Sequence, residues 1–67
     1  MKLYRFITNV DDSEFCHRVT QALNAGWELS GSPSLTYDAK REATICGQAV
    51  TKEVVGDYSR DIKLGDY

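Results

Sequence analysis

The fold is decided by residues 11–26, which read DDSEFCHRVTQALNAG. An aspartate N-cap with Glu14 three residues later makes a capping box, and acids in a first turn suit the positive end of a helix dipole. The apolar side chains that follow recur every three or four residues, as on the packed stripe of a helix. Gly26 is the left-handed residue that ends it. The stretch therefore predicts one amphipathic helix that runs to about Ala25.

Strands are predicted on both sides of this helix. Residues 2–8 are rich in strand-forming residues. Bulky side chains occur on both faces of this strand, so it is expected to be covered on two sides. Residues 43–55 predict another strand, which a polar turn joins as a hairpin to the strand before it. Small residues at 47 and 49 would let a helix approach one side of this strand closely.

In the strand predicted at residues 27–37, apolar and polar residues alternate, so one face is apolar and the other is polar. The apolar face includes Trp27 and Tyr37, which are expected in the core. Pro33 cannot donate to a sheet ladder, so this strand lies at a sheet edge or is broken by a bulge within residues 31–34.

The predicted architecture is an α+β fold of one helix on a three-stranded sheet, in the order strand, helix, strand, strand. If the last strand lies between the other two and runs antiparallel to both, the first two are parallel and the helix is their right-handed crossover. Residues 1–55 then form one domain. Residues 56–67 form an irregular tail whose apolar side chains dock on this chain or on a second copy.

A homodimer is the expected assembly. The chain has 67 residues, and chains this short rarely bury a sufficient core without a disulfide, a metal or a partner subunit. We expect the sheet face away from the helix to be apolar, with a polar Gln48 that needs a hydrogen-bond partner in the second subunit. The predicted interface residues are Tyr4, Phe6, Cys46, Gln48 and Val50.

The charge balance argues against two classes of partner. Ten acidic and eight basic residues give a net charge of -2, and no basic stripe is present, so binding to nucleic acid or to a membrane surface is not expected. The first residues lack a secretory signal, and no window approaches a membrane span. We expect a cytoplasmic protein with two free cysteines.

Catalysis has one candidate pair. Cys16 or Cys46 could act as a nucleophile with His17 as its base, which makes a small cysteine-dependent enzyme one alternative. Neighbours on a helix point about 100° apart, however, so a core Cys16 beside a rim His17 is the preferred interpretation. Metal binding lacks four well-placed ligands, and neither a metal nor a cofactor is expected. A nucleic-acid-binding regulator is the other alternative.

A small polar ligand has a candidate site at the Pro33 edge. Backbone amides freed there, with serine hydroxyls and nearby cations, could hold a polar or anionic group. The alternative is an irregular, solvated edge that blunts the sheet. The predicted ligand-binding residues are Arg18, Ser30, Ser32, Ser34 and Lys40.

Several separated motifs occur together in this chain: YRFIT at 4–8, FCHRV at 15–19, GWEL at 26–29, GSP at 31–33, LTYD at 35–38 and CGQAV at 46–50. Over residues 1–55 the chain thereby resembles a family of small bacterial and phage proteins known as domain of unknown function 1737. The resemblance implies a compact helix-on-sheet domain and carries no established activity. The expected function is that of a non-enzymatic binding or assembly module, with a sequestering or regulatory role by analogy.

Overall fold

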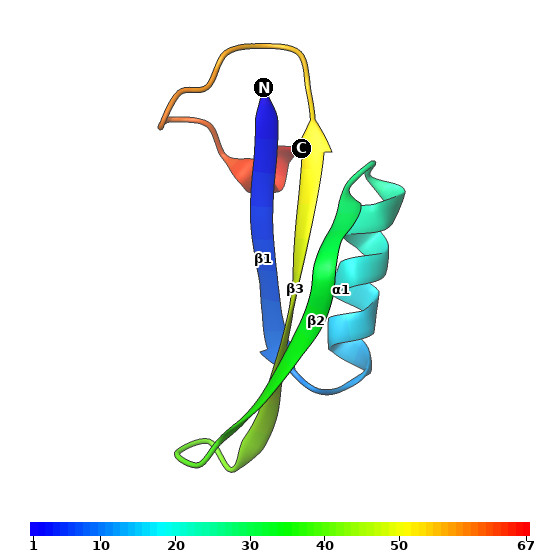
Figure 1. Ribbon diagram of the computed structural model, residues 1–67, viewed down its shortest axis with the longest axis vertical. Helices are drawn as coiled ribbons and strands as arrows, with labels where there is room; N and C mark the ends of the chain where they lie inside the picture. Colours follow the sequence, from blue (N-terminus) through cyan, green and yellow to red (C-terminus); the bar gives the residue numbers. More distant parts are fainter.

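The computed structural model describes all 67 residues and contains one helix on one sheet (Figure 1). Strand β1 (Lys2–Val10) leads into helix α1 (Ser13–Asn24), which is followed by strands β2 (Glu28–Asp38) and β3 (Ala43–Glu53). A single 3₁₀ turn, η1 (Leu64–Asp66), lies in the C-terminal segment. The predicted order of strand, helix, strand and strand is confirmed.

The sheet has the strand order β1-β3-β2, and β3 is antiparallel to both neighbours. Strands β1 and β2 are therefore parallel, and α1 connects them, as predicted (Figure 1). Strand β2 is an edge strand, and its register against β3 shifts between Ser30 and Ser34. Both outcomes predicted from Pro33, an edge and a bulge, are present.

Helix α1 begins one residue later than the sequence suggested. The N-cap is Asp12, whose Oδ1 accepts hydrogen bonds from the backbone N–H groups of Glu14 (3.0 Å) and Phe15 (3.3 Å). Glu14 is thus the second helical residue rather than the third, so the predicted capping box is wrong. Gly26 adopts φ 98°, which confirms the left-handed residue after the helix.

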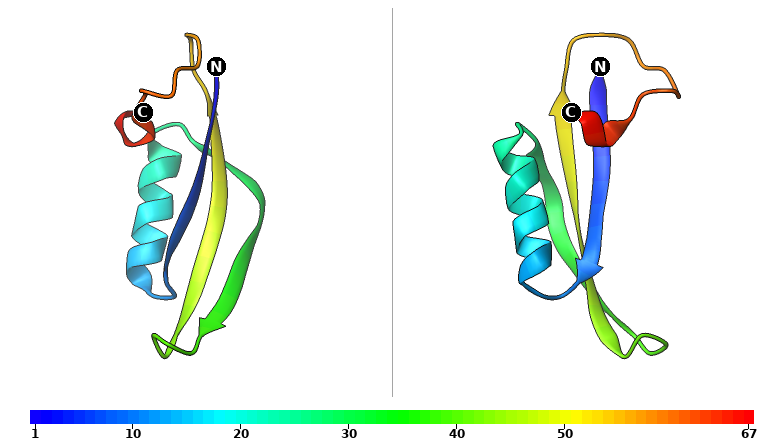
Figure 2. Two further views of the ribbon diagram at one scale, coloured as in Figure 1. Left: turned by 90° about the vertical axis from the view of Figure 1, so that its left-hand side faces the viewer. Right: turned by 180° about the vertical axis from the view of Figure 1, so that it is seen from behind.

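The core lies between α1 and one side of the sheet. Leu3, Ile7 and Val50 project from the sheet towards the helix and pack with Ala22 and Trp27. All five side chains are buried. Figure 2 shows that α1 and η1 lie on the same side of the sheet, which leaves the other side bare.

Strand β3 places Cys46, Gln48 and Val50 on the side of the sheet opposite to the one predicted. The register pairs Val50 with Arg5, Gln48 with Ile7 and Cys46 with Asn9, and these pairs lie on the helix side. Cys46, Gln48 and Val50 are 4%, 5% and 0% exposed within the single chain. These three predicted interface residues therefore lie on the helix side of the sheet and are buried within the single chain. The alternate residues of β1 and β3, on the side of the sheet away from the helix, form what we call the open sheet face. Its residues are Tyr4, Phe6, Thr8, Val10, Ile45, Gly47, Ala49 and Thr51.

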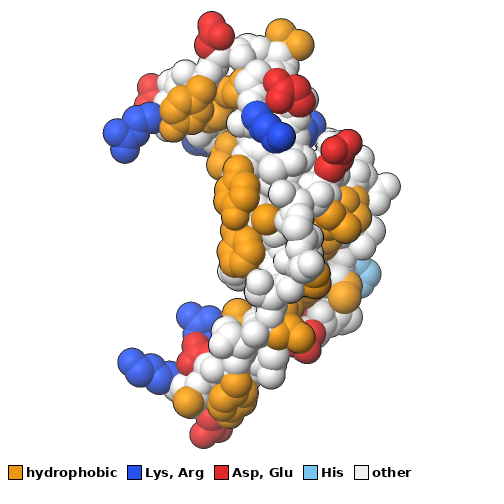
Figure 3. All heavy atoms as spheres, in the orientation of Figure 1, with side chains coloured by type: hydrophobic (Ala, Val, Ile, Leu, Met, Phe, Trp, Pro, Cys, Tyr) orange, Lys and Arg blue, Asp and Glu red, His pale blue; other side chains and the backbone are white.

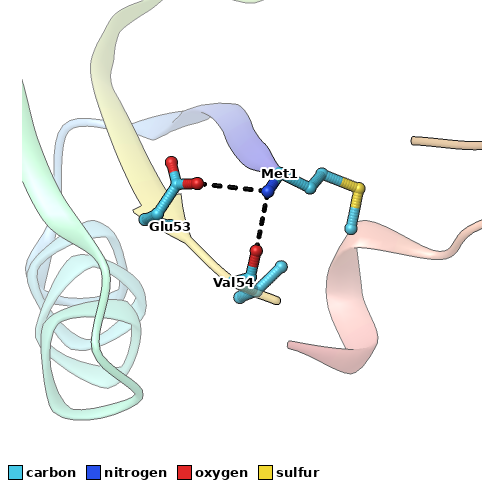
Figure 4. A network of polar contacts seen from close by, with 3 residues as sticks. All are labelled: Met1, Glu53 and Val54. Atoms are coloured by element: carbon cyan, nitrogen blue, oxygen red, sulfur yellow. Dashed lines mark hydrogen bonds and ion pairs between the residues drawn. The ribbon is translucent and has the colours of Figure 1, made fainter. Parts of the chain in front are cut away.

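The chain ends are tied to the rest of the fold. The N-terminal ammonium of Met1 donates to the Val54 carbonyl (2.7 Å) and to Glu53 Oε1 (3.1 Å), as Figure 4 shows. In the tail, Ile62 packs against the core, and Trp27 Nε1 donates to an oxygen of the Tyr67 terminal carboxylate (3.3 Å). Of the two docking sites expected for the tail, the structure therefore has the one on this chain.

Neither helical segment of the structure has the length and hydropathy needed to cross a bilayer.

Candidate functional site

The open sheet face carries exposed apolar side chains on strand β1. Tyr4, Phe6 and Val10 are 57%, 51% and 43% exposed. Figure 3 shows apolar side chains gathered along the hollowed side of the molecule. An uncovered apolar face of this kind is typical of an interaction surface.

The centre of this face is shaped by a glycine. A Cβ atom at Gly47 would lie 2.4 Å from Cζ of Phe6, so the Phe6 ring rests directly on the backbone of β3. A groove of about 160 Å³ runs beside the ring, with Ile45 and Thr36 among its walls. The small residues of β3 therefore seat an aromatic ring on the open face, and not the helix as the sequence suggested.

Charged residues lie at both ends of the open sheet face. At one end, Asp38 forms an ion pair with Arg41 (3.4 Å). At the other end, Lys2 pairs in register with Glu53, and Glu28 pairs with Thr51. These three charged residues line a polar pocket of about 250 Å³ at that end. The centre of the face has no charged side chain, and the mixed signs at its rim suit a partner of similar composition.

Strand β2 leaves a second group of apolar side chains exposed. Leu29, Leu35 and Tyr37 lie in register with Val50, Cys46 and Thr44, on the helix side. Trp27 is buried, as predicted, but Tyr37 is 64% exposed and does not belong to the core. Helix α1 contacts mainly β1, so it does not cover the outer part of β2.

The five predicted ligand-binding residues are not brought into one site. Arg18 Nη1 donates to the Thr8 carbonyl (2.7 Å) and lies on the helix side. Lys40 is in the turn between β2 and β3, where its N–H donates to Asp38 Oδ1 (3.0 Å). Ser30, Ser32 and Ser34 are exposed along β2. No hydrogen bond or ion pair joins either cation to these serines.

Gln48 satisfies the backbone groups that the β2 bulge frees. Its Nε2 donates to the carbonyls of Ser30 (3.4 Å) and Gly31 (3.3 Å) and to that of Ala49 (2.9 Å). The partner that we expected from a second subunit is therefore supplied within the chain. Gln48 fixes the bulge and is not available at an interface.

The cysteines and the histidine do not form a nucleophile–base pair. Cys46 is buried, and its Sγ donates to the Asn9 carbonyl (3.5 Å). Burial, with smaller contributions from Asp11 and Cys16, raises the pKa of Cys46, so this group is a protonated thiol near neutral pH. Cys16 and His17 are exposed, and no hydrogen bond joins His17 to either sulfur.

No group of three or more histidine, cysteine, aspartate or glutamate side chains is arranged to hold a metal ion.

One cavity was not anticipated. It has a volume of about 190 Å³, and Arg5, Arg18, Gln21 and Trp27 are among the residues that line it. The guanidinium carbon of Arg5 lies 5.3 Å from the centroid of the Trp27 ring. The sequence held one signal of it: Arg5 shares its parity with Leu3 and Ile7, so a cation occupies a position on the core side of β1.

Comparison with known proteins gives a family and no function. No curated protein and no solved structure gives a significant match to this chain. One family model, described as Domain of unknown function (DUF1737), matches residues 1–53 of the 67. The match covers both sheet faces and the helix, confirms the resemblance seen in the motifs, and shows that the chain belongs to this family.

Proposed function

We propose that this protein is a non-enzymatic cytoplasmic assembly module that forms a homodimer through its open sheet face. The assembled surface would then bind a protein or a small polar ligand. We take residues 1–55 as the assembling domain and residues 56–67 as a tail packed on the helix side. The surface area of the single chain is the observation that carries the proposal.

The chain exposes 5045 Å², whereas a compact monomer of 7.5 kDa is expected to expose about 4,250 Å². The difference, about 800 Å², is close to the area that each partner buries in a standard-size interface. The radius of gyration is 13.4 Å, compared with about 11 Å for a compact domain of this length. The single chain thus exposes more surface than a compact monomer would, by about the area that one subunit buries in a dimer.

The chemistry of the open sheet face favours a second copy as the occupant. The face centres on Tyr4 and Phe6, and aromatic residues are enriched where interfaces bury the most energy. Its rim carries Lys2 beside Glu28 and Glu53, so two copies can place opposite charges together. Only 8 of 67 residues are buried, and a core that small gains stability from a partner subunit.

Light scattering over a dilution series tests the proposal. The wild-type chain is expected to have the mass of a dimer, and Phe6→Glu should raise the dissociation constant by about 30-fold or more, because an interface hot spot contributes about 2 kcal/mol. Leu29→Glu is the matched control. Leu29 is 56% exposed but lies on the helix side of β2, so this variant should remain a dimer.

A monomeric mass for the folded wild-type chain at every concentration would refute the homodimer. Dissociation by Leu29→Glu and not by Phe6→Glu would place the contact on the other side of the sheet and would equally refute the use of the open sheet face.

A further inference from the structure

We propose that the cavity between β1, α1 and the tail, which we call the arginine cavity, binds a phosphate-type oxyanion. This inference concerns the helix side of the molecule and does not depend on the proposed dimer. Its residues are Arg5, Arg18, Gln21, Ala22, Ala25 and Trp27, closed by Gly65 and Tyr67 of the tail.

The first observation is two cations that form no ion pair. Arg5 and Arg18 are both half-buried and line the same cavity. No aspartate or glutamate lines it, and the ion pairs of the structure involve only Met1 with Glu53 and Arg41 with Asp38. The one anionic group at the cavity, the terminal carboxylate of Tyr67, accepts a hydrogen bond from Trp27 Nε1 and balances at most one of the two charges. A partly desolvated site with a remaining positive charge favours an anion as its ligand.

The second observation is the supply of free donors. Arg18 bonds to the protein only through Nη1, which donates to Thr8 and Asn9, so its Nε and Nη2 groups remain free. Arg5 makes no hydrogen bond and is held by its contact with the Trp27 ring. Stacking on an aromatic face leaves the guanidinium edge available for oxygen atoms. Gln21 adds an amide to the same cavity.

The arrangement favours a tetrahedral oxyanion over a carboxylate. The two guanidinium groups come from different elements, β1 and α1, and each offers a fork that binds two oxygen atoms. A carboxylate has one pair of oxygens, whereas phosphate has four and can engage both forks. A volume of about 190 Å³ fits a group of that size and not a drug-sized molecule.

Trp27 makes the test direct, because it is the only tryptophan of the chain and lies against Arg5. The full chain would be titrated with inorganic phosphate against chloride at constant ionic strength, by tryptophan fluorescence and by calorimetry. We expect saturable binding of phosphate, with acetate weaker by about tenfold.

Matched variants locate the site. Arg5→Gln and Arg18→Gln should each weaken phosphate binding by about tenfold or more, since each removes a charged fork. Arg18→Lys keeps a cation that can bond to the Thr8 carbonyl, so it remains folded, but it should also bind phosphate more weakly. Arg60→Gln, an exposed tail arginine, is the control and should bind as the wild type does.

Three results would overturn the inference. These are the absence of saturable phosphate binding by the wild-type chain, acetate binding as tight as phosphate binding, or unchanged affinity in folded Arg18→Lys and Arg5→Gln. Circular dichroism of each variant establishes that it is folded before its affinity is compared.

Discussion

Two consecutive residues of β1 have opposite environments. Phe6 is 51% exposed on the open sheet face, whereas Ile7 is 2% exposed under the helix. Both are large and apolar, and they belong to the same ladder with β3. The difference shows that strand composition alone does not define a core in this protein, because α1 covers one parity and nothing in the chain covers the other.

Truncation of each of the two side chains to alanine should have very different effects on stability. Ile7→Ala should lower the free energy of unfolding by about 2–5 kcal/mol, since it leaves a cavity in a packed core. Phe6→Ala should change monomer stability by only about 0.5 kcal/mol, as at other exposed sites. Urea unfolding at low protein concentration measures both. Equal losses would mean that the two faces are equally packed within one chain.

A hydrogen bond between β3 and the end of α1 also distinguishes the helix side of the sheet. Lys52 Nζ donates to the Ala25 carbonyl (2.6 Å), where α1 ends. Lys52→Met should therefore lower the free energy of unfolding by about 1 kcal/mol, through a lost hydrogen bond to a helix C-terminus. Lys2→Met, on the open side, is the control and should have a smaller effect in the same thermal unfolding experiment. The reverse ranking would contradict the role of Lys52.

On the open sheet face, Gly47→Ala should have a smaller effect on stability. The new Cβ would meet the Phe6 ring, but a half-exposed ring can swing outwards, so we expect a loss at or below about 1 kcal/mol, the low end for overpacking. The loss should vanish in a Phe6→Ala background, which a double-mutant cycle measures. Gly65→Ala, which meets no neighbour, serves as the control. An undiminished loss in the double mutant would place the strain elsewhere.

The smallest expected effect is a pH dependence on the helix side. Burial raises the pKa of Cys46 above its ordinary value of 9.0. Below that value both the folded and the unfolded chain carry the proton, so stability is complete; above it the unfolded chain deprotonates first, and stability falls as pH rises. Thermal unfolding in reductant should show this decline in the wild type and in Cys16→Ala, but less of it in Cys46→Ala. Identical declines in all three proteins would refute it.

Much of the fold could be predicted because its signals are local. The helix follows from an apolar stripe between an aspartate cap and Gly26, and Pro33 marks both the edge strand and its bulge. The choice of parity in β3 is not local. Both faces of β3 carry apolar residues that could belong to a core. Only the register with β1 places Val50, rather than Ala49, under the helix.

The arginine cavity was hidden for a related reason. Arg5, Arg18 and Tyr67 line one cavity only because α1 packs on β1 and the tail folds back against β1. Spacing along the sequence assigns each of these residues to a face of its own element. It does not reveal that three elements place these residues around one cavity.

The contact between Phe6 and Gly47 also constrains how the sequence can vary within the family. The ring occupies the volume in which any other residue at position 47 would place its first carbon. Among members of the family, an aromatic residue at position 6 should therefore be inherited together with glycine at position 47. Lineages that gain a side chain at one of these positions should reduce the side chain at the other.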